Sequence, residues 1–390
     1  MKNKTLLVIC HAYKNFQKDQ IDELAKYFSK IYVLVRYNPF SEFANFFHNT
    51  SIGRFSKKFI IDFSNKPDNV TVFTTPVLYA PVDFQYRTLG EKHLNVVRDV
   101  IKKNNIHFDI IHSHFTWSAG YVGARLKQEY GKPLILTAHG YDIYDLPFKD
   151  PTWKKSIEFV LNSADHIITV SQRNVNCIRQ LDDHTPVSVI PNGFLVNLFF
   201  PRNSLECRDV IFLPRNKKIL LAVGDLDPVK GYQYLIEAMK IVTEQRKDIL
   251  CVIVGQGPEG KTLSKMIKAK NISDYFLLTG AKPHNEIPIW INACDLFVLP
   301  SLNEGNPTVM FECLGCGKPF IGSDVGGIPE IISSETYGML SKPADVHALS
   351  TNILQALNRK WDHTAILKYS KRFRWHEISK EIIKIYDSFV

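Results

Sequence analysis

The chain has 390 residues, of which 45% are apolar and 22% charged, so it is long enough for two domains with full cores and too apolar to be disordered. No apolar run approaches the ~18–20 residues that a membrane-spanning helix needs, and the first residues lead into a short strand pattern rather than a signal peptide. We therefore expect a cytoplasmic protein.

The net charge of +9 permits a polyanion or an anionic membrane surface as a partner, but charge alone names neither. No nucleic-acid-binding motif accompanies the charge, so no nucleic acid is expected. Seven cysteines at irregular spacing fit a reducing compartment. The one C-x-x-C pair, Cys313 and Cys316, has no second Cys or His pair beside it. We interpret it as two small packing residues rather than a zinc or redox site.

The chain opens with a βαβ pattern. Residues Thr5–Cys10 form a continuous apolar strand, apolar residues recur at helical spacing from Gln20 to Phe28, and Ile31–Val35 reads as a second strand. The loop from His11 to Gln17 joins the first strand to the helix.

Aromatic and basic residues alternate between Arg36 and Ile60. Such a segment suits a lipid interface, with phenylalanines in the headgroup boundary and cations facing anionic lipid. The alternative is core packing together with a lid over an acceptor. The residues concerned are Phe43, Phe46, Phe47, Phe55, Arg54, Lys57 and Lys58.

Histidines stand at the ends of the next two strands. Phe108–His114 carries His112 and His114 on alternate residues, and Pro133–His139 ends before Gly140. Ligands of open parallel sheets gather at the carboxyl ends of the strands. We interpret His112 and His114 as a structural pair rather than a metal site.

The first domain closes with the strand and Pro-Asn-Gly turn of Val187–Gly193, and residues 195–215 lack a hydrophobic period and read as the crossing to a second domain. Strand Lys218–Gly224 then leads through a loop containing Lys230 to an amphipathic helix. A later Gly255-Gln-Gly257 is weak evidence for a nucleotide, since a tight turn explains it equally well.

The most informative stretch is Glu304-Gly-Asn-Pro-Thr-Val-Met-Phe-Glu312, which follows a buried strand at Leu296–Pro300. Asn306 is predicted to be a helix N-cap and Pro307 the first helical residue. Gly305 allows close approach of a ligand, and the free N–H groups of Thr308 and Val309 offer an anion site.

Two carboxylates flank this anion site. Glu312 follows Pro307 by five residues, which is roughly 7–8 Å along a helix, and Glu304 lies just before the helix. The spacing suits a sugar nucleotide, in which one carboxylate accepts hydrogen bonds from sugar hydroxyls and the other from ribose hydroxyls. The plainer alternative is a surface loop followed by a solvent-facing helical glutamate.

This stretch, together with Cys316-Gly-Lys-Pro-Phe-Ile-Gly-Ser-Asp-Val-Gly-Gly-Ile-Pro-Glu330, resembles the donor site of family-4 retaining glycosyltransferases. The resemblance implies an α/β GT-B fold, in which two Rossmann-like domains face each other across a cleft. It implies an acceptor-side domain at 1–200, completed by a C-terminal helix at 374–390, and a nucleotide-sugar domain at 201–373. Further matching segments follow in the family's order at 109–114, 139–142, 190–193, 223–231 and 371–389.

The resemblance also assigns roles to individual residues. It implies that His139 faces the donor sugar, that Gly224 and Lys230 belong to the diphosphate loop, and that the backbone around Lys282 meets the base. The chain departs from the family where Asp225 replaces an arginine, and where residues 11–17 lack the usual paired glycines. The first departure removes one cation, and the second weakens any expected phosphate contact by that loop.

The predicted function is that of a metal-independent retaining glycosyltransferase without a cofactor. It would move a hexosyl group from a UDP-sugar or GDP-mannose to a hydroxyl of a lipid-linked or cell-surface glycan, in the cytoplasm or on the inner face of the cell membrane. The alternatives are a sugar-nucleotide epimerase and a lapsed homologue that binds an active transferase. The catalytic candidates are Lys230, Glu304 and His139, and the donor-binding candidates are Gly224, Lys230, Lys282, Glu304, Gly305, Asn306, Pro307, Thr308, Val309 and Glu312.

Overall fold

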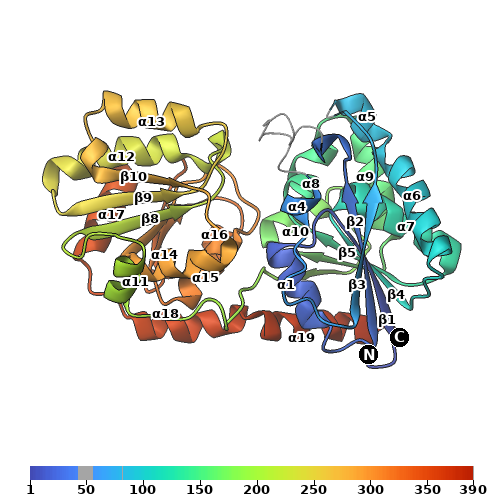
Figure 1. Cartoon of the computed structure of the whole chain (residues 1–390). Helices are drawn as coiled ribbons and strands as arrows, with labels where there is room; N and C mark the ends of the chain where they lie inside the picture. The colour runs from blue at the N-terminus through green and yellow to red at the C-terminus, as the bar shows by residue number, and fades with distance from the viewer. Residues whose placement is uncertain (43–55, 81, 390) are drawn as a thin grey trace. The chain divides into compact units, whose positions relative to one another are not determined.

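The computed structural model describes residues 1–42, 56–80 and 82–389, and the chain divides into two compact units. Unit 1 comprises Met1–Pro191 and Trp375–Val390, and unit 2 comprises Asn192–Arg374 (Figure 1). Each unit has its own parallel sheet and its own core, as the α/β GT-B prediction requires.

Unit 1 is built on a seven-stranded sheet of order β3-β2-β1-β4-β5-β6-β7, and neighbouring strands pair in parallel. The predicted strand Thr5–Cys10 is confirmed as β1. The register pairs Val8 with Val33 on one side and with His112 on the other. The strands are β1 (Thr5–Cys10), β2 (Lys30–Tyr37), β3 (Val70–Pro76), β4 (Ile110–His114), β5 (Leu134–Ala138), β6 (His166–Thr169) and β7 (Val187–Val189).

Helices cover both faces of this sheet, and its central strands are accordingly buried on both sides. The core includes Trp153, Val122 and Leu136, each at most 1% exposed. The principal helices are α1 (Asn15–Leu24), α4 (Lys57–Ile60), α5 (Asp83–Arg87), α6 (Leu89–Lys103), α7 (Tyr121–Tyr130), α8 (Tyr141–Tyr144), α9 (Pro151–Ser163), α10 (Gln172–Ile178) and α19 (Trp375–Asp387).

Helix α19, the last of the chain, packs on helix α1 within unit 1 (Figure 1). The ring of Tyr386 meets Phe28 edge-on with centroids 5.6 Å apart, and its hydroxyl hydrogen-bonds to Nδ1 of His112 in strand β4. The predicted apolar spacing through Ile378 and Ile382 faces the core, since both side chains are buried. The C-terminus of the chain therefore completes the core of the unit that the N-terminus begins.

Unit 2 has a six-stranded parallel sheet of order β10-β9-β8-β11-β12-β13, with a separate apolar core on each face. Its strands are β8 (Lys218–Val223), β9 (Ile249–Val254), β10 (Phe276–Gly280), β11 (Leu296–Leu299), β12 (Phe320–Ser323) and β13 (Gly338–Ser341). Its principal helices are α11 (Ser204–Val210), α12 (Tyr232–Gln245), α13 (Gly260–Ala269), α14 (Ile287–Ala293), α15 (Thr308–Gly315), α16 (Ile328–Ile331), α17 (Val346–Asn358) and α18 (His363–Ser370).

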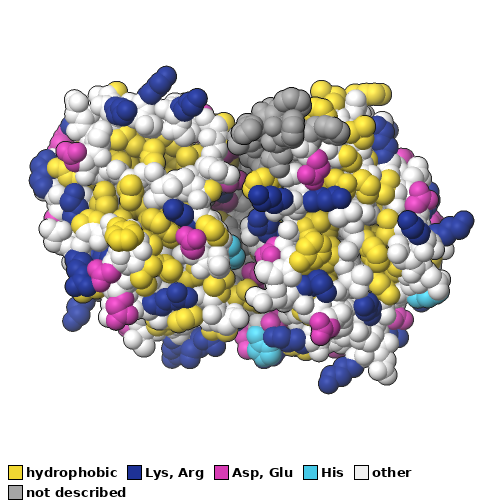
Figure 2. Space-filling view, in the orientation of Figure 1, with side chains coloured by type: hydrophobic (Ala, Val, Ile, Leu, Met, Phe, Trp, Pro, Cys, Tyr) yellow, Lys and Arg dark blue, Asp and Glu magenta, His cyan; other side chains and the backbone are white. Residues whose placement is uncertain are grey.

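On the visible face of the molecule (Figure 2), charge is spread rather than gathered. On the face drawn in Figure 2, Lys and Arg side chains are scattered among acidic, apolar and neutral groups. Within the described ranges, no helix is both long enough and apolar enough to cross a membrane.

Candidate functional site

The stretch between strand β11 and helix α15 forms a loop at the carboxyl edge of the unit 2 sheet, where ligands of parallel sheets bind. The predicted cap is wrong. Helix α15 begins at Thr308, and Pro307 occupies the capping position with extended dihedral angles (φ −66°, ψ 120°). Thr308 and Val309 are the first two helical residues, so their N–H groups have no intrahelical partners. Both residues are half-buried.

Asn306 fails to cap the helix because its side chain is used elsewhere. Its Oδ1 accepts a hydrogen bond from the backbone N–H of Asn192 at 2.9 Å, and its carbonyl oxygen accepts one from Nδ2 of Asn192 at 2.8 Å. Asn192 belongs to the Pro-Asn-Gly turn that enters unit 2. The two asparagines therefore pin the site loop to the start of the unit.

Lys230 and Glu304, predicted separately as catalytic residues, contact each other. Nζ of Lys230 donates to Oε1 of Glu304 at 2.7 Å, and the hydroxyl of Ser301 donates to the same oxygen at 2.7 Å. Glu304 is only 8% exposed, so this carboxylate is held by a cation and a hydroxyl as buried charges require. Among the described residues, none donates to the second oxygen of Glu304, Oε2.

Two glycines bring the loops of Lys230 and Glu304 together. A Cβ at Gly231, where φ is +67°, would lie 2.1 Å from the carbonyl oxygen of Pro300. A Cβ at Gly326, where φ is +57°, would lie 1.8 Å from the carbonyl oxygen of Glu304. The N–H of Gly327 also donates to the carbonyl oxygen of Gly305 at 2.8 Å. Backbone therefore packs directly on backbone around the loop of Glu304.

We expect Gly326→Ala to destabilise unit 2 more than Gly280→Ala does. Both glycines have a positive φ, +57° and +74°, but a Cβ at Gly280 would meet nothing within 4 Å. Gly280→Ala should cost ~1–2 kcal/mol through its backbone conformation alone, whereas Gly326→Ala adds a clash of ~1–3 kcal/mol. Thermal melting of the two variants measures the difference. Equal melting temperatures would show that the turn at residues 326–327 can shift to accommodate a Cβ without loss of stability and does not support Glu304.

Glu312, the candidate for the ribose, lies on helix α15 and is 7% exposed. Its Oε1 shares a 2.9 Å hydrogen bond with Nε2 of His284. His284 escaped the sequence prediction, although it lies within the segment predicted to meet the base. Lys282, in the same segment, places Nζ 5.6 Å from the ring centre of Trp290. The segment before helix α14 thus contributes a histidine to Glu312.

Asp225, which departs from the family pattern, lies just after the end of strand β8. Gly224 follows the strand, and a Cβ there would lie 3.0 Å from the hydroxyl of Tyr232. That hydroxyl is buried and has no hydrogen-bond partner among the described residues. Burial raises the pKa of Tyr232, and the charges of Glu304 and Asp225 raise it further. Asp225, at the position where the resemblance predicts an arginine, therefore lies near a neutral tyrosine.

In unit 1, His139 lies in a cluster of histidines at the carboxyl ends of strands β4 and β5. Its Nε2 and Nδ1 of His114 share a 3.0 Å hydrogen bond, while its own Nδ1 is buried without a partner among the described residues. Burial, and then the neighbouring His114, hold the pKa of His139 well below its usual value. Burial lowers the pKa of His114 to about 3. Both imidazoles are neutral at pH 7.

Asp142 fixes the loop that presents His139. Its carboxylate accepts hydrogen bonds from the backbone N–H groups of His139, Gly140 and Thr116 at 2.8–3.1 Å. Burial raises the pKa of Asp142, and those N–H donors oppose the rise. His112 is a structural residue, as predicted, because its ring bonds to Thr137 at 2.7 Å and to Tyr386. No group of three potential metal ligands occurs in the described part of the chain.

The minor motifs have structural explanations. Cys313 and Cys316 are buried at the end of helix α15, and burial raises the pKa of both thiols. A Cβ at Gly255 would lie 1.8 Å from the carbonyl oxygen of Gly224, so this glycine serves loop packing. Of the segment predicted to meet a membrane, Phe43, Phe46, Phe47, Arg54 and Phe55 lie outside the described residues, whereas Lys57 and Lys58 begin helix α4.

Known families match both units. The family model described as glycosyl transferases group 1 matches residues 204–374, and the model described as glycosyltransferase family 4 matches residues 55–196. An uncharacterized glycosyltransferase of Methanocaldococcus jannaschii is 28% identical over 83% of this chain and 86% of its own length. The N-acetyl-alpha-D-glucosaminyl L-malate synthase of Bacillus anthracis is 26% identical over 78% of this chain and 80% of its own.

Solved structures agree on the fold. The Anabaena protein HepE, solved in complex with UDP, superposes with a TM-score of 0.75 at 21% identity, covering 99% of this chain and 100% of its own. Two parallel Rossmann-like units with such a neighbour define an α/β fold of the GT-B type. The matched families make the assignment narrower. The chain belongs to the family-4 glycosyltransferases.

Proposed function

We propose that this glycosyltransferase moves a hexosyl group from a UDP-sugar or GDP-mannose to a hydroxyl of a lipid-linked or cell-surface glycan, with retention and without a metal. The observation that carries the proposal is the ion pair of Lys230 and Glu304, set four residues before the start of helix α15. A cation, a carboxylate and a helix N-terminus in one loop system match the phosphate and hydroxyl groups of a sugar nucleotide.

In the proposed reaction the bond between the anomeric carbon and the diphosphate breaks while the acceptor hydroxyl oxygen bonds to the anomeric carbon on the same face and passes its proton to the departing phosphate oxygen. Negative charge grows on the leaving diphosphate. Lys230 and the N–H groups of Thr308 and Val309 would stabilise that charge, because fixed donors cost no reorganisation as the reaction proceeds. Pro307 sets the helix start, and Gly305 and Asn306 shape the approach to it.

We propose the remaining donor contacts residue by residue. Oε2 of Glu304 would accept from sugar hydroxyls while Oε1 stays bound to Lys230. Glu312, oriented by His284, would accept from the ribose hydroxyls. The backbone beside Lys282 would meet the base, and Gly224 would line the diphosphate loop. His139 would contact the hexosyl group through its unpartnered Nδ1. The Anabaena neighbour was solved in complex with UDP, which supports a nucleotide donor.

A thermal-shift panel of UDP, GDP and their common sugar conjugates tests the donor, followed by turnover assays with hydroxyl acceptors. Stabilisation by a nucleoside diphosphate and by its sugar conjugates is expected, since a ligand at 100 times its Kd adds about 2.7 kcal/mol. Nucleotide-sugar interconversion without an acceptor would instead reveal an epimerase. Absence of donor binding in calorimetry would reveal a lapsed homologue, which the aspartate at position 225 would then explain.

We also propose that unit 1 docks on an anionic membrane surface. Helix α4 presents Lys57, Lys58 and Phe59 to solvent, and Phe63 is 61% exposed just beyond it. Lys57 is partly engaged, because its Nζ lies 4.5 Å from the ring centre of Tyr37. Cations and aromatic rings exposed together favour the headgroup region of anionic lipid.

Sedimentation with anionic vesicles tests the docking. Lys57→Glu with Lys58→Glu should weaken vesicle binding at least about 30-fold, because each lysine near an anionic surface contributes about 1 kcal/mol. The matched control reverses the exposed pair Lys102 and Lys103 on helix α6 of the same unit. Equal sedimentation of both variants and the wild type, at low salt and with equal melting temperatures, would remove helix α4 from the membrane.

A further inference from the structure

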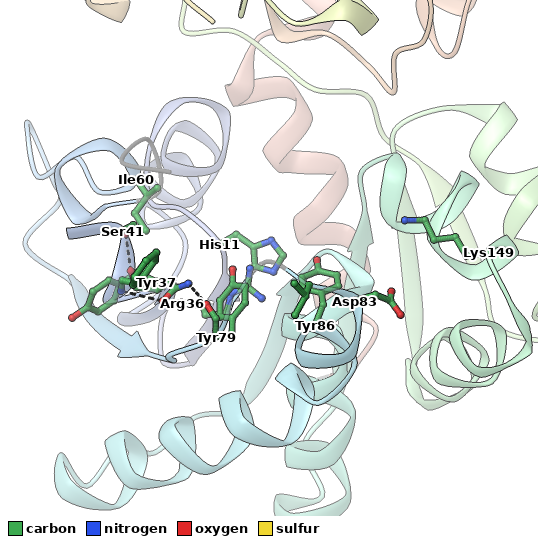
Figure 3. Close-up of a pocket in the computed structure, with 12 residues that line it drawn as sticks. His11, Arg36, Tyr37, Ser41, Ile60, Tyr79, Asp83, Tyr86 and Lys149 are labelled. Atoms are coloured by element: carbon green, nitrogen blue, oxygen red, sulfur yellow. Dashed lines mark hydrogen bonds between the residues drawn. The ribbon is translucent and has the colours of Figure 1, made fainter. Parts of the chain in front are cut away.

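Unit 1 contains a pocket of about 530 Å³ that none of the proposed donor residues lines. Its size falls within the ~300–1,000 Å³ range of small-molecule sites. It opens at the carboxyl ends of β1, β2 and β3, because its lining comes from the residues that end or follow these strands (Figure 3). The lining consists of His11, Arg36, Tyr37, Asn38, Phe40, Ser41, Ile60, Tyr79, Val82, Asp83, Tyr86 and Lys149.

Arg36 gives this pocket a positive charge without a counter-ion. Its Nη1 donates to the hydroxyl of Ser118 at 3.0 Å, and its guanidinium lies 5.6 Å from the ring centre of Tyr79. Within the described ranges, Arg36 forms no salt bridge with a carboxylate. A guanidinium has five N–H donors in a planar fork, and Arg36 lines the pocket, so donors beyond the one on Ser118 are left for a ligand there.

The neighbours of Arg36 are neutral. His93 bonds through Nδ1 to Ser118 and through Nε2 to Thr75, and burial followed by the charge of Arg36 holds its pKa well below the usual value. Burial, and then the charge of Arg36, also hold the pKa of His11 well below its usual value. Its Nε2 is buried without a partner in the described part of the chain. The positive field at the pocket floor is therefore uncompensated by the protein.

The other charges of the lining are already engaged. Asp83 accepts from Arg87 and from Nε1 of Trp153 at 3.1 Å, and its carboxylate points away from Arg36 in Figure 3. Nζ of Lys149 donates to the hydroxyl of Tyr141 and lies 3.8 Å from Asp145. Arg36 is thus the charged group of the lining that is left to meet a ligand.

The rest of the lining is aromatic and apolar. The rings of Tyr79 and Tyr86 have centroids 6.5 Å apart, and Figure 3 shows them beside Arg36 and His11. Phe40 and Val82, which also line the pocket, are 46% and 52% exposed. Aromatic faces and apolar edges offer contact area to the C–H faces of a sugar or to an alkyl chain.

The histidine cluster connects this pocket to His139. The ring of His11 stacks on Phe115 with centroids 4.8 Å apart, and Phe115 lies 4.5 Å from His139 by the same measure. All three residues follow strands of the unit 1 sheet at its carboxyl edge. A ligand in the pocket therefore lies within two ring contacts of the residue that we expect to meet the transferred sugar.

We propose that this pocket is an acceptor subsite in which Arg36 binds a phosphate or carboxylate group carried by the acceptor, while the tyrosine rings hold its sugar or alkyl body. The inference rests on the proposed function, which supplies the transferase, and it narrows the acceptor to an anionic class. A phosphate or carboxylate presents two oxygens in a plane, which match the guanidinium fork of Arg36. Because the neighbours of Arg36 are neutral, no carboxylate among the described residues competes with the ligand for the guanidinium.

Calorimetry in saturating UDP tests the subsite, since UDP keeps the probes out of the donor site. The probes are glucose 6-phosphate, glucuronate, citronellyl phosphate, inorganic phosphate and glucose. The anionic glycoside or lipid probes should bind, and glucose should bind far more weakly. Arg36→Met should weaken the anionic probes about 10–150-fold, the equivalent of one charged hydrogen-bonding partner at ~1.5–3 kcal/mol.

Two control variants separate the role of Arg36 from a loss of fold. Arg125→Met removes another arginine of unit 1 that stacks on aromatic rings, 5.2 Å from Tyr121 and 4.7 Å from Phe159, and should leave every probe unaffected. Arg36→Lys keeps the charge and should recover part of the affinity. Ser118 keeps its bond to His93 in every Arg36 variant, so no buried hydroxyl is orphaned.

The outcomes are distinct. Preference for citronellyl phosphate over glucose 6-phosphate would assign the anion to a lipid carrier, and the reverse preference to a sugar. Unchanged probe affinities in Arg36→Met, or inorganic phosphate binding as tightly as the larger anions, would overturn the subsite. If the wild type binds UDP but no anionic probe, the subsite fails while the proposed function stands. If neither UDP, GDP nor their sugar conjugates bind, the proposed function itself fails.

Discussion

Lys230→Ala should lower kcat about 10²–10³-fold, the scale for one donor that stabilises transition-state charge. Nζ of Lys230 is 2.7 Å from Glu304 Oε1, in the loop system that ends at helix α15. As the glycosidic bond breaks, charge accumulates on the diphosphate, so the lysine matters more in the transition state than in the donor complex. We therefore expect kcat to fall more than KM rises. Initial rates at saturating donor concentration measure the fall in kcat.

The control for this prediction is Lys240→Ala. Lys240 lies on helix α12, which begins just after Lys230, and it forms a solvent-exposed pair with Glu244. Its removal should leave kcat unchanged. Because Lys230→Ala leaves Glu304 with Ser301 alone, melting temperatures must accompany the kinetics. A loss of less than threefold at saturating donor, in a protein that melts like the wild type, would show that Lys230 does not act on the leaving group.

Glu312→Ala should weaken binding of free UDP about 10–150-fold, since it removes a hydrogen-bonded charged partner worth ~1.5–3 kcal/mol. Glu312 is 7% exposed and is oriented by His284. His284→Ala should produce the same change with a smaller magnitude, because the carboxylate remains but loses its orientation. Calorimetric titration with UDP measures both variants.

The comparison variant for the ribose assignment is Glu304→Ala. Glu304 lies in the same loop and helix system and is equally buried, but we assign it to the sugar. It should therefore leave the Kd of free UDP nearly unchanged and lower turnover of the complete donor. If Glu304→Ala and Glu312→Ala weaken UDP equally, the two carboxylates have been given the wrong partners. An unchanged Kd in Glu312→Ala would remove this residue from the ribose.

Strand positions could be predicted from the sequence because buried parallel strands read as continuous apolar runs. Thr5–Cys10 and Leu296–Leu299 are found almost residue for residue. The helix start at residues 306–307 could not be predicted by the same local reasoning. The sequence Asn-Pro favours a cap, but Asn192, more than a hundred residues away, donates hydrogen bonds to the side-chain Oδ1 and to the backbone carbonyl oxygen of Asn306. Local preference yielded to a tertiary contact.

The site shows the same division. Lys230, Glu304 and Glu312 could be selected from their motifs, but their pairing with Ser301 and His284 depends on which loops meet at the sheet edge. The Arg36 pocket was out of reach for a related reason. In sequence, Arg36 reads as one cation of a basic and aromatic segment. Its lack of a carboxylate partner among the described residues is visible only once Tyr79 and Ser118 are placed beside it.

Helix α19 has a consequence for how the protein is made. Unit 1 is discontinuous, since Trp375–Val390 completes a core that begins at Met1. During synthesis, strand β4 emerges early, yet His112 can form its hydrogen bond with the hydroxyl of Tyr386 only after residue 386 has left the ribosome. Unit 2 lies wholly within one stretch of chain and can close first. The part of the protein made first is therefore finished last, and no single cut of the chain separates two complete units.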